Sequence, residues 1–155
     1  MTLHQLFFEQ VEPGMTLPPL VKRPTAIQIF RFSAATWNAH QIHYNAAYAR
    51  EQEGYPDILV QAHLHGCYLA EMVQAWIGGR GRLAKFGWQN RRAAVPGDEL
   101  TCTGVVTRTY VERGSGFVEC ALEERNQHSE LCAPGQALVS LPRLGEDGAR
   151  EQPTR

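Results

Sequence analysis

The chain has 155 residues, and 15 Lys and Arg against 16 Asp and Glu give a formal net charge of −1. A chain of this length usually folds as one domain, and interspersed charges of both signs exclude a basic footprint for nucleic acid or an anionic membrane. No segment approaches the roughly 18 apolar residues of a membrane span, and MTLHQLFFEQVEPGMTLPP lacks the basic flank of a signal peptide, so we expect a cytoplasmic protein.

The first half of the chain predicts one strand and two helices. PTAIQIFRFSAATW carries Ile27, Ile29 and Phe30 behind a proline and predicts a strand with an irregular exit. A short helix should follow, because Asn45 is a natural N-cap and residues 46–53 are mostly good helix formers. VQAHLHGCYLAEMVQAWIGG is the longest helical pattern, and its apolar residues cover most of the circumference, which is typical of an enclosed helix.

The second half predicts strands. RLAKFGWQNRRAAV, LTCTGVVTRTYVE and FVECALEERNQ are separated by the turns PGDE, expected to be a hairpin turn, and RGSG, and QALVSLP closes the set. We therefore predict an α+β fold in which a curled, meandering antiparallel sheet of about five strands wraps one long central helix, with a short extra helix. Residues 1–142 would form this domain and residues 143–155 a flexible tail, because the sequence from Gly145 is polar.

Cysteine and histidine spacing gives no metal motif. His63 and His65, two residues apart on the long helix, cannot share one face. We expect at least one of them in the core or an interface, and neither as a ligand. No CxxC pair and no suitably spaced histidine accompany the cysteines, so we expect no metal or redox site and four buried, small hydrophobic side chains. The cysteines are Cys67, Cys102, Cys120 and Cys132.

One stretch carries a family resemblance. FRFSAATWNAHQIHYNAAYAREQEGYP resembles the hydratase motif of MaoC-like hot-dog proteins, roughly Ser/Thr-Gly-Asp-x-Asn-Pro-Ile/Leu-His-x-Asp-x-x-Tyr-Ala. It is most similar to the HTD2-like (FAS1-like) dehydratase branch, where a phrase like FRFSA-TFN-H-IHYD--YA--EGYP recurs, and the similarity covers roughly Pro13 to Pro142. The resemblance implies a hot-dog fold, hydration of an enoyl thioester of CoA or an acyl-carrier protein, or the reverse dehydration, and a homodimer or pseudo-dimer with a related chain.

Carried over residue by residue, the family's catalytic Asp falls on Asn38, its catalytic His on His43 and its motif Asn on His40. Hydration needs a base, a proton for Cα and donors for the enolate oxygen, and requires no metal or redox cofactor. A neutral imidazole before a helix N-terminus suits both proton steps. An amide cannot take a proton, so either Asn38 only orients water while His43, with help from His40, carries both transfers, or the enzyme is slow, altered or inactive.

The family also opens its central helix with an HG pair whose glycine N–H polarises the thioester carbonyl. By alignment the pair falls on Gln61-Ala62. A helix-start N–H works without glycine where φ and ψ permit, so the resemblance implies Ala62 as the oxyanion donor. The sequence has an actual His-Gly pair one helical turn later, which makes Gly66 the alternative oxyanion donor.

Four residues are candidate substrate contacts: His40, Tyr48, Gln61 and Arg91. Arg91 lies beside Arg92 in a predicted strand, where one of the two could meet a CoA phosphate or a substrate carboxylate. Four aromatic and Met side chains could line an acyl tunnel, but residues of these types at helical or strand spacing more often belong to an ordinary core. They are Tyr68, Met72, Trp76 and Trp88.

Two rival functions remain open at this stage. A hot-dog thioesterase is one, because IHYNAAYA loosely resembles its loop, but thioesterases usually need a carboxylate, and the central helix supplies only Glu71. A non-catalytic acyl-thioester-binding partner subunit is the other, because Asn38 and Ala62 both depart from the general pattern.

Overall fold

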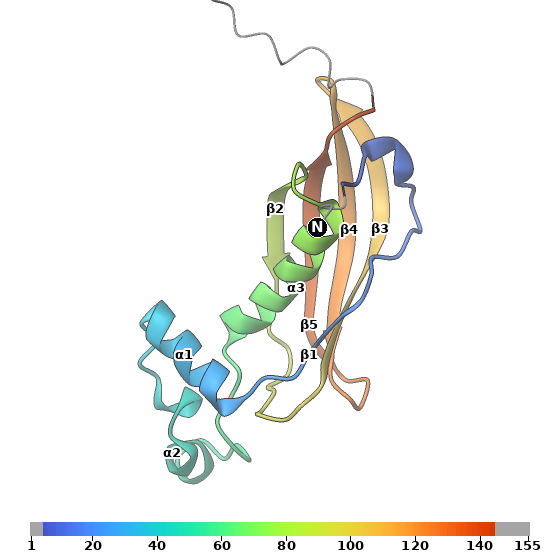
Figure 1. Cartoon of the computed structure of the whole chain (residues 1–155). Coiled ribbons are helices and arrows are strands. Elements are labelled where there is room, and N and C mark those ends of the chain that lie inside the picture. The colour runs from blue at the N-terminus through green and yellow to red at the C-terminus, as the bar shows by residue number, and fades with distance from the viewer. Residues whose placement is uncertain (1–4, 145–155) are drawn as a thin grey trace, which may run out of the picture.

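A computed structural model describes residues 5–144 (Figure 1). The helical segments are η1 (Phe8–Gln10), α1 (Ala26–Thr36), η2 (Gln41–His43), α2 (Ala46–Glu51) and α3 (Ala62–Ile77). The strands are β1 (Leu20–Lys22), β2 (Arg82–Trp88), β3 (Leu100–Glu112), β4 (Ser115–Arg125) and β5 (Leu131–Leu141).

The five strands form one antiparallel sheet in the order β1-β3-β4-β5-β2. A two-residue turn joins β3 to β4, and both of its residues, Arg113 and Gly114, have positive φ, as tight hairpin turns that match strand twist require. Only β3, β4 and β5 form the predicted meander, in which strands that follow one another in sequence pair side by side. Because β2 lies beside β5 at the far edge, the chain must cross before β3 begins. The prediction that PGDE is a hairpin turn is therefore wrong.

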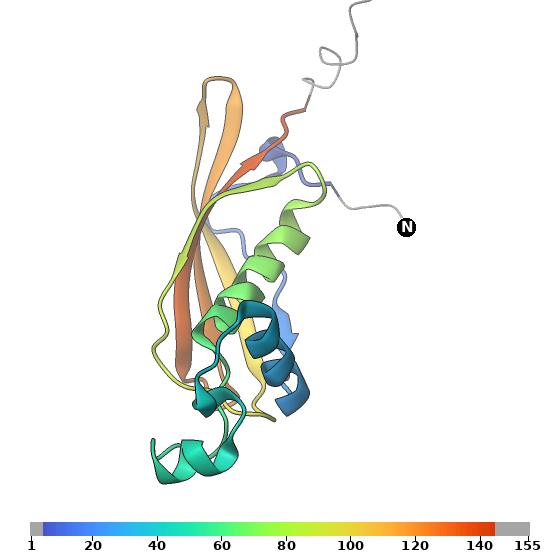
Figure 2. The ribbon, with the colours of Figure 1, turned by 90° about the vertical axis from the view of Figure 1, so that its left-hand side faces the viewer.

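The curled sheet wraps α3, as predicted (Figure 2). Buried α3 side chains such as Leu69, Met72 and Val73 pack against alternate β4 residues, including Val118 and Cys120. The buried residues cover more than half of the helix circumference, whereas His63, Cys67, Glu71 and Gln74 form an exposed face, so α3 is less fully enclosed than the sequence predicted.

The predicted strand over PTAIQIFRFSAATW is wrong, because residues Ala26–Thr36 form α1. The Thr25 side chain caps the helix by accepting the N–H of Gln28 at 3.2 Å. Ile29 and Ser33 are buried one turn apart, which is helical spacing. Figure 1 shows α1 set apart from the strands of the sheet. The sheet edge beside β3 is instead β1, a three-residue strand that the sequence pattern did not reveal.

The short helix α2 is confirmed. The Asn45 side chain accepts the N–H of Tyr48 at 3.1 Å and so caps the helix as expected. The helix ends at Glu51, two residues earlier than predicted, before Gly54, which has a positive φ of 73°.

The core contains a buried polar pair. His65 of α3 and Glu124 of β4 are both 0% exposed, and the imidazole Nδ1 contacts the carboxylate Oε1. The other carboxylate oxygen lies 3.8 Å from the Cys102 thiol. His65 is thus a core histidine, as expected for at least one of the two, while His63 is exposed on the same helix.

Two smaller predictions fail. Cys67 is exposed, although the other three cysteines are buried as expected. Arg91 and Arg92 lie after the end of β2 rather than in a strand, and both backbone N–H groups donate to the Cys132 carbonyl.

Near the C-terminus, Arg143 and Leu144, which were expected in the flexible tail, both bond to Glu9. The rest of the predicted tail lies outside the described residues. No helix in residues 5–144 is long and apolar enough to cross a membrane, and the cytoplasmic location stays a prediction.

Candidate active site

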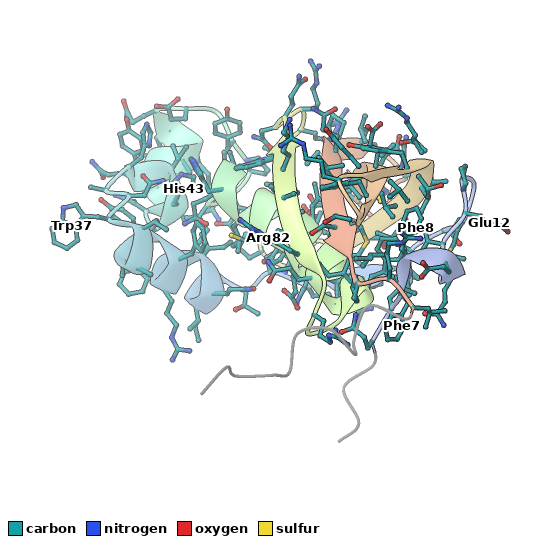
Figure 3. The ribbon with its side chains drawn as sticks, turned by 90° about the horizontal axis from the view of Figure 1, so that it is seen from above. Phe7, Phe8, Glu12, Trp37, His43 and Arg82 are labelled. Atoms are coloured by element: carbon teal, nitrogen blue, oxygen red, sulfur yellow. The ribbon has the colours of Figure 1, made fainter. Side chains whose placement is uncertain are left out.

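One end of the molecule, where α1, η2, α2 and the start of α3 lie together, carries most of the candidate residues: Asn38, His40, His43, Tyr48, Gln61 and Ala62 (Figure 1). His43 ends η2, is only 8% exposed, and lies among these helical segments, while Trp37 lies at their outer margin (Figure 3). The His43 Nδ1 lies 2.9 Å from the Leu59 carbonyl oxygen. A carbonyl only accepts, so Nδ1 carries the proton and Nε2 keeps its lone pair. The fold thus selects the tautomer that a general base needs.

The surroundings of His43 also favour its neutral form. Burial is the largest influence and lowers its pKa, the bond to the Leu59 carbonyl raises it, and the neighbouring His40 lowers it. The net shift is downward from 6.5. His43 therefore stays an unprotonated base at a pH where a free imidazole would already bind a proton.

This shift predicts the pH profile of kcat/KM for any reaction in which His43 acts as the base. Activity should fall at acid pH only as His43 becomes protonated, so the acid limb should have its midpoint below 6.5. His40→Gln removes the neighbouring charge and should move that midpoint upward, while His128→Gln, on the exposed connection between β4 and β5, should leave it in place. An acid limb unaffected by His40→Gln would contradict the charge coupling between the two histidines.

His40 is the link between His43 and α2. Its ring centroid lies 6.2 Å from the rings of both His43 and Tyr48. Its Nδ1 accepts the N–H of Ile42 at 3.3 Å, which caps η2. The Tyr48 hydroxyl bonds to Glu53, and burial together with that carboxylate raises the pKa of Tyr48. The structure thus brings together two of the four candidate substrate contacts.

Asn38 follows α1 in a tight turn. Trp37 has a φ of 55° and ends the helix in the left-handed conformation, and the Asn38 N–H donates to the Ser33 carbonyl at 2.9 Å. The Asn38 Oδ1 accepts the N–H of His40 at 3.2 Å. The amide oxygen therefore holds the loop that leads to His43, while its NH₂ group makes no hydrogen bond within residues 5–144 and can donate to water.

A shallow, apolar groove of about 210 Å³ runs beside Asn38. Its walls come from α1 and from the loop that follows: Phe30, Ser33, Ala34, Trp37, Asn38, Ala39 and Tyr44. His43 is not among these lining residues, so the groove adjoins the histidine site without containing His43.

The start of α3 supplies backbone donors. The helix begins at Ala62 after Gln61, and the first intrahelical bonds come from Leu64 and His65, which both donate to the Gln61 carbonyl. The first N–H groups of a helix have no acceptor within it, which leaves those of Ala62 and His63 available. The Gln61 side chain is 1% exposed and donates to the Ile29 carbonyl and the Ser33 hydroxyl, both at 2.8 Å. Gln61 thus ties α1 to α3 rather than facing solvent.

Gly66 lies inside α3, one turn beyond these free donors, and its geometry supports a packing role. A Cβ built on Gly66 would come within 2.5 Å of the Trp88 ring. Ala62 is therefore the better placed of the two predicted oxyanion donors.

Gly66→Ala is expected to displace Trp88 and lower the free energy of unfolding by about 1–3 kcal/mol, the usual cost of overpacking. Urea unfolding followed by circular dichroism would measure this loss. Gly79→Ala is the matched control, because a Cβ there meets nothing within 4 Å. Equal unfolding midpoints for the two variants would contradict the close contact.

Arg91 and Glu71 lie away from the histidines in sequence and make their own contacts. The exposed Arg91 guanidinium bonds to Gln89, on the loop after β2. Glu71 pairs with Lys22 at 2.6 Å and lies nine residues after Ala62, roughly 13 Å along the helix at 1.5 Å per residue. No group of three or more His, Cys, Asp or Glu in the described part of the chain could hold a metal ion.

Sequence reasoning missed three contributors to this site. They are the carbonyl of Leu59, the hydroxyl of Ser33 and the indole of Trp88, which donates to the Ala62 carbonyl at 3.0 Å. Nothing in the sequence points to the Leu59 carbonyl or the Ser33 hydroxyl. The Trp88 indole could have been suspected, because the N–H of a buried tryptophan usually finds an acceptor.

Solved structures with the same fold define the class. The unliganded (R)-hydratase PhaJ1 from Pseudomonas aeruginosa superposes with a TM-score of 0.80 at 18% identity, over 90% of this chain and 87% of that one. One chain of the ChsH1-ChsH2 complex from Mycobacterium tuberculosis gives a TM-score of 0.74 at 21% identity, over 84% and 98%. The fold is therefore the hot-dog fold found in hydratases.

Sequence comparison is more specific. The family model for hydroxyacyl-thioester dehydratase type 2 matches residues 17–96, so the chain belongs to that family. The mesaconyl-C(4)-CoA hydratase of Chloroflexus aurantiacus is 48% identical over 46 residues, which are 30% of this chain but only 16% of that relative's length.

Proposed function

We propose that this protein catalyses the reversible hydration of an enoyl thioester, or equally the dehydration of a 3-hydroxyacyl thioester. Membership of the dehydratase family supports the reaction class. The observation that carries the proposal is the buried His43, whose Nδ1–H is held by the Leu59 carbonyl so that Nε2 keeps its lone pair.

In the hydration direction, His43 Nε2 takes a proton from water as the water oxygen bonds to Cβ. The electrons of the double bond move onto the thioester oxygen, where the Ala62 N–H stabilises the developing negative charge. The imidazolium then returns a proton to Cα, so that both proton transfers use one residue. Asn38 orients the water by donating from its NH₂ group while its oxygen keeps the loop in place. This chemistry needs no metal or redox cofactor, and CoA or an acyl-carrier protein enters only as part of the substrate.

The main test uses purified protein with crotonyl-CoA and mesaconyl-CoA. Loss of the enoyl-thioester absorbance without release of free thiol is the expected result. Free thiol release would instead indicate a thioesterase, a function that the remote, ion-paired Glu71 makes unfavourable. Binding with neither change would indicate a non-catalytic partner subunit.

Asn38 has its own test. Asn38→Ala removes both the loop contact and the water donor, and is expected to lower kcat about tenfold. Asn38→Asp keeps an acceptor for the His40 N–H and adds a second proton acceptor, so it should hydrate crotonyl-CoA at least as fast as the parent. A faster Asn38→Ala variant would contradict a role for Asn38 in orienting water.

We also propose that the working unit is a homodimer or a pseudo-dimer with a related hot-dog chain. Strand β2 lies at the edge of the sheet, which leaves its outer backbone groups available to pair with another strand. The occurrence of the fold in the ChsH1-ChsH2 complex supports this proposal. Light scattering after size-exclusion chromatography would measure the mass, and a monomer at assay concentrations that is fully active would contradict it.

A further inference from the structure

Trp88, the last residue of β2, is held in one position against the start of α3. Its ring stacks on Phe86 with centroids 5.4 Å apart, and the His63 ring meets it edge to face at 5.8 Å. The missing side chain of Gly66 provides the space for the ring. In this position the indole N–H donates to the Ala62 carbonyl at 3.0 Å. A strand residue thus makes a directed bond to the helix end that bears the free N–H groups.

That bond acts on one particular donor. The carbonyl of one residue and the N–H of the next belong to the same peptide unit, and a hydrogen bond accepted by the carbonyl makes that N–H a stronger donor. The Gln61 carbonyl accepts bonds from Leu64 at 2.9 Å and His65 at 3.2 Å, which strengthens the Ala62 N–H. The Ala62 carbonyl accepts the Trp88 bond, which strengthens the His63 N–H in the same way.

We propose that Trp88 is a positioning residue of the oxyanion site, which holds and polarises the Ala62–His63 peptide unit so that the His63 N–H becomes a second donor to the thioester oxygen. This inference rests on the proposed function, because it assigns two backbone donors to the carbonyl that hydration must polarise. Two donors aimed at one oxygen are the usual arrangement where an enolate or oxyanion forms. Trp88 acts through the peptide unit and does not itself touch the substrate.

The test compares Trp88→Phe with the matched variant Trp76→Phe. Trp76 is buried, whereas Trp88 is partly buried, and the Trp76 indole makes no hydrogen bond within the described residues. Trp88→Phe is expected to lower kcat for crotonyl-CoA about three- to tenfold, the effect of one lost hydrogen bond, with KM changed less than twofold. Trp76→Phe should leave kcat unchanged. Trp88→His, which restores a ring N–H, should recover part of the loss.

A spectroscopic measurement separates this role from simple packing. The absorption of a bound cinnamoyl thioester moves to longer wavelength as its carbonyl is polarised. Trp88→Phe should reduce this red shift, and Trp76→Phe should not. If Trp88→Phe fails to fold, site-specific replacement of Trp88 by benzothienylalanine, which exchanges the N–H for sulfur at nearly constant shape, provides the same comparison.

An unchanged kcat together with an unchanged red shift, in a folded variant that lacks the indole N–H, would overturn the proposal. Failure of the donor assignment and failure of the proposed function give different results. If the parent protein hydrates no enoyl-CoA but still shows a red shift that depends on Trp88, the proposed function is wrong and the donor assignment stands.

Discussion

Replacing His43 by alanine is expected to lower kcat for crotonyl-CoA hydration by about 10²–10⁴-fold, the usual range for loss of a general acid–base group. The effect should be large because in the proposed mechanism one imidazole carries both proton transfers, and an amide such as that of Asn38 cannot take a proton in its place. KM should change less than kcat, because the proposed role of His43 is to act on water and Cα rather than on the CoA moiety. Steady-state kinetics at a pH above 6.5, where the base is neutral, measure the effect directly.

A control must exclude unfolding, since the His43 side chain is buried and bonded to the Leu59 carbonyl. Thermal melting should therefore accompany the kinetics, and His128→Ala, a histidine on the exposed β4–β5 connection, should behave like the parent in both measurements. Hydration at the parental rate by a folded His43→Ala protein would exclude the mechanism, even if the activity itself is present.

Glu124→Ala is expected to lower the free energy of unfolding by about 3–5 kcal/mol, the usual cost of removing one partner from a fully buried polar or ionic pair. The substitution leaves His65 enclosed with no acceptor for Nδ1, while its Nε2 already has no hydrogen-bond partner within residues 5–144. Urea denaturation monitored by circular dichroism measures the loss of stability. The urea concentration at the transition midpoint should fall, while the dependence of the unfolding free energy on urea stays the same.

Glu123→Ala is the matched control, because the adjacent carboxylate forms an ion pair with Arg125 that is 42–46% exposed, and such pairs contribute at most about 1 kcal/mol. The double variant His65→Leu/Glu124→Leu removes both buried polar groups together, and should recover much of the stability lost in Glu124→Ala. A Glu124→Ala protein as stable as Glu123→Ala would contradict the importance of the pair.

Long periodic segments were predictable from the sequence, and short or context-dependent ones were not. Alternation in β4 and the broad apolar face of α3 reflect contacts repeated over many residues. Helix α1 was missed because aromatic and β-branched residues such as Ile27 and Phe30 favour strands locally, whereas Thr25 capping and the burial of Ile29 decide the structure. The three residues of β1 are too few to form a pattern.

The candidate site likewise combines residues that the local sequence identifies with contacts that it does not. Asn38, His40 and His43 follow one another in the chain, so a motif could identify them together. The Leu59 carbonyl that sets the tautomer of His43 comes from 16 residues away, and the Trp88 indole reaches Ala62 from 26 residues away. Such contacts depend on tertiary packing and leave almost no trace in local composition.

The strand order has a consequence for the time course of folding. Strands β3, β4 and β5 are neighbours in sequence and in the sheet, whereas Leu20 must pair with Cys102 and Arg82 with Ser140 at the two edges. Closing long loops costs conformational entropy and slows folding, so we expect the meander to form first. Residues 23–81, which carry His43, run from one edge strand to the other, so catalytic competence should arise late. Pulsed hydrogen exchange during refolding should protect β4 amides before those of α2, and the reverse order would contradict this sequence of events.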